Sequence, residues 1–353
     1  MDNPKQTLGG FVTATLLFAG AIFLYNWSSS FSNELVLSRK EHFCKQLSST
    51  NNIQAYGDEL GNALAKASMG NKTVIIAIVN RAYVEQDLES VTTMFDLFLT
   101  SFWLGEGTRF LIDHLLVVAM DKTAYDRCQF LKLNCFRLET EGIDFEGEKL
   151  FMSREFIKMM WRRTSFLLEV LKRGYSFIFT DTDVMWLRNP LTRLSKDETE
   201  DIQISTDKYL GDPWSEMNEI NTGFYFVRSN KKTISLFETW YGMKDNAKGK
   251  KEQDVLFDLI RSGIIRNLGL RVRFLNTLYF SGFCQDSNDF KAVITVHANC
   301  CRTITAKVVD LKAALSDWKR FRRFEANSTV IPRWTEHNSC FQSWGRQAKT
   351  IKI

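Results

Sequence analysis

Short apolar runs alternate along the chain with longer stretches in which apolar residues recur every three or four positions. The apolar runs, each bounded by polar residues, occupy positions 73–79, 115–120 and 175–179. Runs of this length predict buried strands. The periodic stretches at 91–104 and 154–172 predict amphipathic helices, and Gly174 is a stop signal after the second. Strands that alternate with helices predict an α/β fold whose mostly parallel sheet has both faces covered.

The same alternation continues through the second half of the chain. Further strands are expected at 201–206, 221–227, 271–274 and 292–296, and one more within 128–138 after a helix end. Helical spacing recurs at 234–241, and another helix opens at Glu252. At 353 residues the chain could form one large domain or two small ones, and 44% hydrophobic with 25% charged residues is ordinary for a globular protein. We therefore expect a sizeable buried core.

The N-terminus differs from the rest of the chain. Residues 8–25 contain no charged side chain and are rich in Leu, Phe, Ala and Gly. About twenty residues cross the hydrocarbon core of a bilayer, so this stretch predicts a transmembrane signal anchor. A cleaved signal peptide is the competing interpretation, because Ser28 and the two serines after it are small. The expected organisation is a cytoplasmic tail at 1–7, an anchor at 8–27, a stem at 28–71, the α/β domain at 72–325 and a C-terminal extension at 326–353.

The net charge and the cysteine content indicate which kinds of ligand the protein is expected to bind. The net charge is only +5 and no basic run is interleaved with aromatic residues, so no nucleic-acid partner is expected. The modest positive excess is compatible with an anionic substrate. The seven cysteines contain no CxxC pair, which argues against zinc, and their odd number leaves a free thiol unless chains cross-link. In a lumenal protein disulfides are expected, and Cys128 with Cys135 is one conceivable local pair. Glycosylation sequons occur at Asn26, Asn71 and Asn327.

The strand expected at 175–179 is followed by two carboxylates, Asp181 and Asp183, separated by Thr182. Because a strand alternates its side chains, both could project to the same side at its C-terminal edge, where open α/β sheets bind ligands. Two hard oxygen donors can hold Mg²⁺ or Mn²⁺, and such an ion can neutralise a diphosphate. An isolated Asp-x-Asp is more often a solvated turn. Here the preceding helix, glycine and buried strand favour a metal site on the rim of the sheet.

Other candidate residues follow the ends of predicted strands. His297 follows a late strand and is either a third ligand for Mn²⁺ or a structural histidine. Tyr83 follows the first strand and is either a half-buried ring or a platform for a nucleotide base. Gly223 permits close approach of backbone or ligand. Glu252 and Asp254 put two carboxylates in the first turn of a helix, which the helix dipole alone would explain.

A set of motifs in a fixed order resembles a known family. Residues 159–163 read Met-Met-Trp-Arg-Arg, residues 171–175 read Leu-Lys-Arg-Gly-Tyr, and residues 180–190 read Thr-Asp-Thr-Asp-Val-Met-Trp-Leu-Arg-Asn-Pro. The motifs Asn221-Thr-Gly, Glu252-Gln-Asp and His297-Ala-Asn-Cys-Cys follow. Together, over residues 73–321, they make the chain similar to the plant nucleotide-diphospho-sugar transferases of glycosyltransferase family 77.

The resemblance implies a GT-A fold, which is a single αβα sandwich that binds a nucleotide sugar through a divalent metal, and transfer with retention of configuration. It implies Asp181, Asp183 and His297 as ligands of Mn²⁺ or Mg²⁺, Asp207 and Asn221 as sugar contacts, Gln253 and Asp254 as residues near the anomeric carbon, and Lys307 as a diphosphate contact. Gln253 would stabilise the cationic sugar through its carbonyl oxygen. Arg302 is the alternative to Lys307, because the segment 302–306 lacks a glycine that some relatives carry.

The family also implies a reaction and a location. Pentose or galactose would pass from a UDP-sugar to a cell-wall polysaccharide or glycoprotein acceptor. The enzyme would be a Golgi membrane protein of single-pass type II topology with a lumenal catalytic domain, alone or as a homo- or hetero-oligomer.

Two other classes share the Asp-x-Asp signal or the fold. A haloacid-dehalogenase-type phosphatase also places Asp-x-Asp after a strand, but usually after the first one. A catalytically inactive, membrane-anchored carbohydrate-binding scaffold would keep the fold alone, and intact Asp181, Asp183, Gln253 and His297 argue against it.

Overall fold

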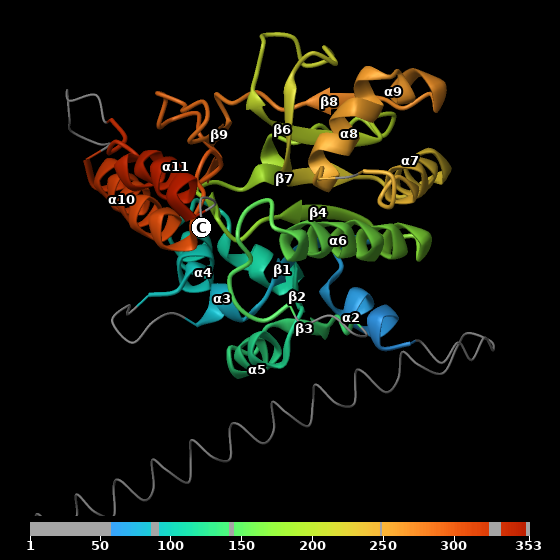
Figure 1. Cartoon of the computed structure of the whole chain (residues 1–353). Helices are drawn as coiled ribbons and strands as arrows, with labels where there is room; N and C mark the ends of the chain where they lie inside the picture. The colour runs from blue at the N-terminus through green and yellow to red at the C-terminus, as the bar shows by residue number, and fades with distance from the viewer. Residues whose placement is uncertain (1–57, 86–91, 141–144, 248, 325–332, 351–353) are drawn as a thin grey trace, which may run out of the picture. The chain divides into compact units, whose positions relative to one another are not determined.

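The computed structural model describes residues 58–85, 92–140, 145–247, 249–324 and 333–350, which belong to one compact unit, Gly57–Ile353 (Figure 1). The anchor predicted at 8–27 and most of the predicted stem lie outside the described residues. Within these five segments, no helix has the length and apolar character needed to cross a membrane.

Seven strands form the central sheet in the order β3-β2-β1-β4-β7-β6-β8. Their bounds are β1 Thr73–Val79, β2 Leu115–Ala119, β3 Asn134–Arg137, β4 Ser176–Thr180, β6 Ile202–Lys208, β7 Glu219–Val227 and β8 Val272–Phe274. β1 pairs in parallel with β2 and β4, whereas β7 is antiparallel to both of its neighbours, β4 and β6. The mostly parallel sheet predicted from the sequence is confirmed, with β7 as its exception.

Helices cover both faces of this sheet, because each strand sends alternate side chains to opposite sides. Ile75 and Ala77 pack into one core, and Val74 and Ile76 pack into the other. The first core contains α4 Met94–Leu104, α5 Lys122–Phe130 and α10 Ile304–Phe324, and the second contains α2 Glu59–Ala67, α6 Arg154–Lys172, α7 Lys231–Gly242 and α8 Glu252–Arg261. The predicted three-layer αβα architecture is therefore confirmed (Figure 1).

A second, three-stranded sheet carries His297. It consists of β5 Val184–Trp186, β9 Phe280–Gly282 and β10 Thr295–His297, with β10 in the middle. β10 runs antiparallel to β5, and the register places His297 opposite Val184, the residue after Asp183. Pairing between two short strands thus brings a histidine from late in the chain to the carboxylate pair. The sequence pattern predicted only one strand of this sheet, the run at 292–296 that overlaps β10.

Local signals set the helix boundaries. α6 begins after Ser153, whose hydroxyl accepts a hydrogen bond from the Phe156 N–H, and the chain turns away at Gly174, which has a positive φ of 78°. α4 begins at Met94, later than predicted, because Thr93 and Asp96 form a capping box. The remaining short elements are α3 Arg81–Val84, α9 Ile264–Asn267, and the 3-10 turns η1 Arg109–His114 and η2 Pro190–Thr192.

Three disulfides join described segments. They are Cys128–Cys135, Cys284–Cys300 and Cys301–Cys340. The local pair anticipated from the sequence is confirmed, and Cys44 lies outside the described residues. The third disulfide attaches α11 Asn338–Thr350, within the predicted C-terminal extension, to the segment that precedes α10.

Candidate active site

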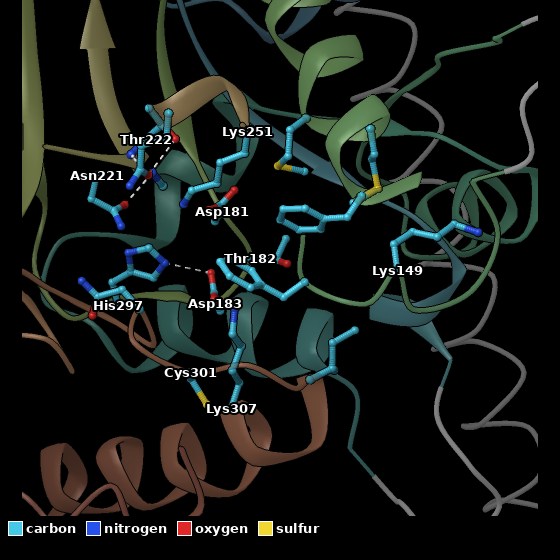
Figure 2. A pocket seen from close by; sticks show the side chains of 18 of the residues that line it. Lys149, Asp181, Thr182, Asp183, Asn221, Thr222, Lys251, His297, Cys301 and Lys307 are labelled. Atoms are coloured by element: carbon cyan, nitrogen blue, oxygen red, sulfur yellow. Dashed lines mark hydrogen bonds and ion pairs between the residues drawn. The ribbon is translucent and has the colours of Figure 1, made fainter. Parts of the chain in front are cut away.

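Asp181, Asp183 and His297 come together beyond the C-terminal end of β4. Each offers one ligand atom, and the three atoms lie within 4.8 Å of one another. Asp183 and His297 are buried, and His297 Nε2 lies 3.2 Å from Asp183 Oδ1 (Figure 2). Carboxylate oxygens with one imidazole suit a divalent ion such as Mn²⁺ or Mg²⁺. The predicted trio is therefore assembled in a form that can bind a metal.

Arg163 of α6 fixes the position of Asp181. Its Nη1 lies 2.9 Å from Asp181 Oδ1, while its Nη2 pairs with Glu252 Oε1 and donates to Thr222 Oγ1 at 3.1 Å. Arg163 and Glu252 are both almost fully buried. Burial alone would lower the pKa of Arg163, but Glu252 and Asp181 outweigh burial and raise it, so the guanidinium stays charged. A buried cation with two carboxylate partners holds the metal ligand in one orientation.

Asp183 has two partners, one at each oxygen. Lys307 of α10 places its Nζ 2.6 Å from Asp183 Oδ2, whereas His297 contacts Oδ1 (Figure 2). Although burial alone would raise the pKa of Asp183, Lys307 and His297 lower it, so this carboxylate is ionised. Burial raises the pKa of Asp181, against the opposing effect of Arg163. A divalent cation would favour the ionised form of both carboxylates.

Gly223 of β7 allows two of these side chains to approach the backbone closely. A Cβ at this position would lie 2.3 Å from His297 Cε1 and 2.9 Å from Asp181 Oδ2. The close approach anticipated for Gly223 is thus made by two candidate metal ligands. Only a residue without a side chain fits between them.

These residues lie in a cavity of about 280 Å³ that gathers side chains from distant parts of the chain. Other residues that line it are Asn80, Tyr83, Phe151, Asp207, Asn221, Lys251, Glu252, Gln253, Asn299, Arg302 and Trp344. Almost every residue predicted for the site is therefore in one place. The exception is Asp254, which does not line the cavity.

The first turn of α8 presents Gln253, but not Asp254, to the cavity. Gln253 Oε1 accepts hydrogen bonds from the Thr222 N–H at 3.0 Å and from the Thr222 hydroxyl at 3.1 Å. The Thr222 hydroxyl has one proton and also lies 3.0 Å from Glu252 Oε1, so the backbone N–H is the donor that Gln253 Oε1 does not share. The role expected for this oxygen, stabilising a cationic sugar, stays a prediction. Asp254 Oδ2 accepts from the Lys251 N–H at 3.2 Å and closes the start of the helix. Its position gives Asp254 a capping role and no contact with the cavity.

Asp207 and Asn221, both predicted as sugar contacts, are hydrogen-bonded to each other. Asn221 Nδ2 donates to Asp207 Oδ1 at 2.8 Å, and Asn299 Nδ2 donates to the same oxygen at 2.7 Å. Asn221 Oδ1 in turn accepts from the Gly223 N–H at 2.7 Å. This network fixes a carboxylate in the cavity wall close to the metal ligands.

Tyr83 and Asn80 line the cavity after β1. Tyr83 is half-buried, and burial raises its pKa to about 12, so the phenol stays protonated at neutral pH. Asn80 is buried, and its Nδ2 donates to the carbonyls of Phe145 and Gly147 at 2.7 and 3.0 Å. Among the described residues, its Oδ1 has no hydrogen-bond partner. The side-chain amide is therefore held in one orientation, and its oxygen is a buried acceptor whose hydrogen bond is not made within the described part of the chain.

Lys307 and Arg302, the alternative diphosphate contacts, both line the cavity. Lys307 pairs with Asp183, whereas the guanidinium carbon of Arg302 lies 3.9 Å from the centre of the Trp344 ring and 4.5 Å from that of Phe151. The side chain of Lys251 also points into the cavity (Figure 2). The cavity thus collects several cations around the candidate metal site.

Sequence reasoning missed Asn80, Arg163, Lys251 and Trp344 as cavity residues. Arg163 could have been noticed, because it falls three residues after Met160 on the apolar stripe of α6, where a charge is unexpected. Trp344 gave no signal, because the Cys301–Cys340 bridge that holds its helix cannot be deduced from spacing.

Comparisons with known proteins agree with this site. The profile of the family described as nucleotide-diphospho-sugar transferase matches residues 110–311. An uncharacterized protein of Arabidopsis thaliana is 52% identical over 336 residues, which is 94% of this chain and 94% of that protein. The Arabidopsis beta-arabinofuranosyltransferase RAY1 is 26% identical over 183 residues, which is 51% of this chain and 32% of that protein.

A third relative, the UDP-galactose:fucoside alpha-3-galactosyltransferase of Dictyostelium discoideum, is 30% identical over 102 residues, 28% of this chain and 16% of that protein. The family profile spans more than half of the chain and includes Asp181, Asp183 and His297. The chain therefore belongs to the nucleotide-diphospho-sugar transferases, a family of glycosyltransferases.

Proposed function

We propose that this chain is a metal-dependent, retaining glycosyltransferase that moves a pentose or galactose from a UDP-sugar to a cell-wall polysaccharide or glycoprotein acceptor. The observation that carries the proposal is the Asp181, Asp183 and His297 group, paired with Lys307, in the cavity of a family member. The arabinofuranosyl and galactosyl transfers named for two relatives favour a pentose or galactose donor.

Asp181, Asp183 and His297 would hold Mn²⁺ or Mg²⁺. Bound there, the ion would supply Lewis-acid stabilisation of the charge that develops on the diphosphate as the sugar leaves. Lys307 already lies 2.6 Å from Asp183 and would place a second positive charge beside the same diphosphate. Arg163 would keep Asp181 oriented through the ion pair described above.

The fixed amide of Asn80 supports uridine as the nucleoside. Both hydrogen bonds of its Nδ2 go to backbone carbonyls, and its Oδ1 is buried without a partner among the described residues. A base could therefore pair with this amide only at the oxygen, once the cavity wall moves to expose it. The imide N–H of uracil is a donor that would satisfy this oxygen, whereas the equivalent ring nitrogen of cytosine is an acceptor. Tyr83 would stack on the base, in keeping with its place in the cavity wall.

The first turn of α8 supports a front-face mechanism. Glu252 Oε1 is engaged by Arg163 and Thr222, and its buried Oε2 has no partner among the described residues. A carboxylate that is neutralised by a buried guanidinium and whose second oxygen is also buried is a poor nucleophile. The acceptor oxygen would bond to the anomeric carbon on the face from which the diphosphate leaves, and its proton would pass to the departing phosphate oxygen. Gln253, in the cavity wall, would stabilise the cationic sugar through its carbonyl oxygen.

The same proposal includes a location: the catalytic domain would lie in the Golgi lumen, attached to the membrane by an N-terminal type II anchor. Three disulfides among the described residues are typical of a protein that matures in an oxidising compartment. The apolar stretch at residues 8–25 is long enough for the anchor.

The test uses the full-length chain, Mn²⁺ and a panel of UDP-sugars, with UDP release followed with and without EDTA. We expect metal-dependent release from at least one donor, and Asp183→Ala should lose it. UDP binding without release from any donor would favour the inactive scaffold. Failure to bind UDP in the presence of Mn²⁺ would overturn the proposal.

A further inference from the structure

Two exposed aromatic side chains stand on α11 at the edge of the cavity. Phe341 is 80% exposed and Trp344 is 47% exposed. Residues three apart lie on the same face of a helix, so the two rings are neighbours. Trp344 also lines the cavity that holds the metal-ligating group. The aromatic face of α11 is therefore continuous with the candidate active site.

The aromatic face is held firmly in place. The Cys301–Cys340 disulfide attaches α11 to the segment that precedes α10. Asp310 of α10, which is buried, accepts from the Cys340 N–H at 2.7 Å. Ser343 Oγ accepts from the Arg302 N–H at 3.0 Å. The helix is therefore anchored by a disulfide and hydrogen bonds, and the Phe341 ring that it carries is nevertheless exposed to solvent.

Trp344 contacts a second segment of the cavity wall through Arg302. Its Nε1 donates to the Cys300 carbonyl at 2.7 Å, and its ring lies against the Arg302 guanidinium, which also lies against Phe151. Beside Phe151, Leu150 and Met152 are exposed as well, at 55% and 36%. Apolar groups thus lie around the cavity on two segments that are distant in the sequence.

Leaving large rings in water forgoes the stabilisation that burial would bring, so a contiguous exposed apolar surface beside a cavity indicates a binding site. An acceptor that approaches the cavity from the side of α11 would meet this surface first. A sugar ring has faces made of C–H groups, which pack against the faces of aromatic rings, and an aromatic pair is therefore suited to a glycan chain.

We propose that Phe341 and Trp344 form the platform that binds the acceptor glycan outside the cavity, an inference that rests on the proposed transferase function. Phe341 would contact a sugar unit farther from the reacting hydroxyl than Trp344. Phe341 does not line the cavity, so it contributes to acceptor affinity alone, whereas Trp344 also packs against Arg302 in the cavity wall. Loss of the Phe341 ring should therefore weaken acceptor binding while UDP binding is preserved.

The experiment titrates the full-length chain, with Mn²⁺ and UDP present, with short oligosaccharides of arabinose, xylose and galactose by calorimetry. Phe341→Ser and the double variant Phe341→Ser with Trp344→Ala are compared with wild type. Binding of the best oligosaccharide should weaken by about three- to tenfold in the single variant and more in the double, the range expected for aromatic contacts. UDP affinity should stay within about twofold in Phe341→Ser, whose ring does not line the cavity.

The matched controls are Trp103→Ala and Phe130→Ala, which remove rings that are 56% and 75% exposed on α4 and α5. Trp344→Phe keeps an aromatic ring but loses the Nε1 hydrogen bond, so it separates the effect of ring stacking from the effect of that hydrogen bond. This variant should retain most of the oligosaccharide affinity. The proposal is overturned if wild type binds none of the oligosaccharides, if Phe341→Ser binds them unchanged, or if the controls weaken binding equally. Loss of vesicle binding in place of oligosaccharide binding would assign the surface to a membrane and also overturn it. Failure of wild type to bind UDP would instead count against the transferase function itself.

Discussion

Gly223→Ala adds one methyl group between two candidate metal ligands. The added carbon would lie 2.3 Å from His297 Cε1, whereas ordinary contacts begin near 3.4 Å. The imidazole, the strand or both must therefore move by roughly 1 Å, and the Asp181 carboxylate, at 2.9 Å, must also give way. Neither ligand moves freely, because Asp181 is paired with Arg163 and His297 ends the central strand β10.

The expected effect falls mainly on metal-dependent function. Misplacement of a reacting or coordinating group by about 1 Å costs on the order of 10²-fold in activity. Overpacking a closely fitted site also costs about 1–3 kcal/mol in the free energy of unfolding. We therefore expect Gly223→Ala to fold, with a lower unfolding midpoint, and to lose most metal-dependent UDP binding and UDP release.

The assay is a Mn²⁺ titration of UDP binding and UDP release in the full-length chain, together with thermal unfolding. Gly242→Ala is the matched control, because a Cβ at that position on α7 meets nothing within 4 Å. The control should keep its Mn²⁺ response and should be no less stable than wild type. Gly223→Ala with an unchanged Mn²⁺ dependence would refute the reasoning, because it would show that the ligands do not need this close approach.

Three further predictions concern groups around the cavity. Arg163→Met strands Glu252 as a buried carboxylate and should lower the free energy of unfolding by about 3–5 kcal/mol, measured by urea denaturation. Adding Glu252→Leu should restore stability but not metal-dependent activity, and a stable single variant would contradict this. UDP should bind at least about tenfold more tightly than CDP in calorimetry, because Asn80 offers only an acceptor, and equal affinities would contradict that role. Because the folded pKa of Tyr83 is raised from 10.0 to about 12, folding favours its neutral phenol, so its contribution to stability is complete below pH 10 and is lost as pH rises toward 12. Tyr83→Phe should therefore lose less stability over that window in urea melts, and identical pH slopes in both proteins would refute the assignment.

Local patterns predicted much of the fold, because strands and amphipathic helices are set by periodicity that any single stretch displays. The bounds expected for β1 and α6 agree with the structure. The proximity of Asp181 and Asp183 followed from their spacing at a strand end. The pairing of β5 with β10 that brings up His297 could not be derived in this way, because each strand is only three residues long.

The parts of the site that escaped prediction depend on contacts between distant residues. The orientation of Gln253 on α8 is set by Thr222 on β7, and the charge on Arg163 of α6 is compensated by Glu252 on α8. Neither partner is visible in the local sequence. Asp254 does not line the cavity, and a local capping interaction, which the sequence did display, accounts for its acidity.

The adjacent cysteines 300 and 301 bond in different directions, one to Cys284 and the other to Cys340. Cys284, Cys300 and Cys301 all line the cavity, and Cys340 lies on α11, the helix that carries Trp344. The short segment after His297 is therefore cross-linked to two separate parts of the chain. A reducing agent that opened the Cys301–Cys340 bridge would detach the wall that carries Trp344, while the hydrogen bonds and ion pairs of Asp181 and Asp183 would stay intact.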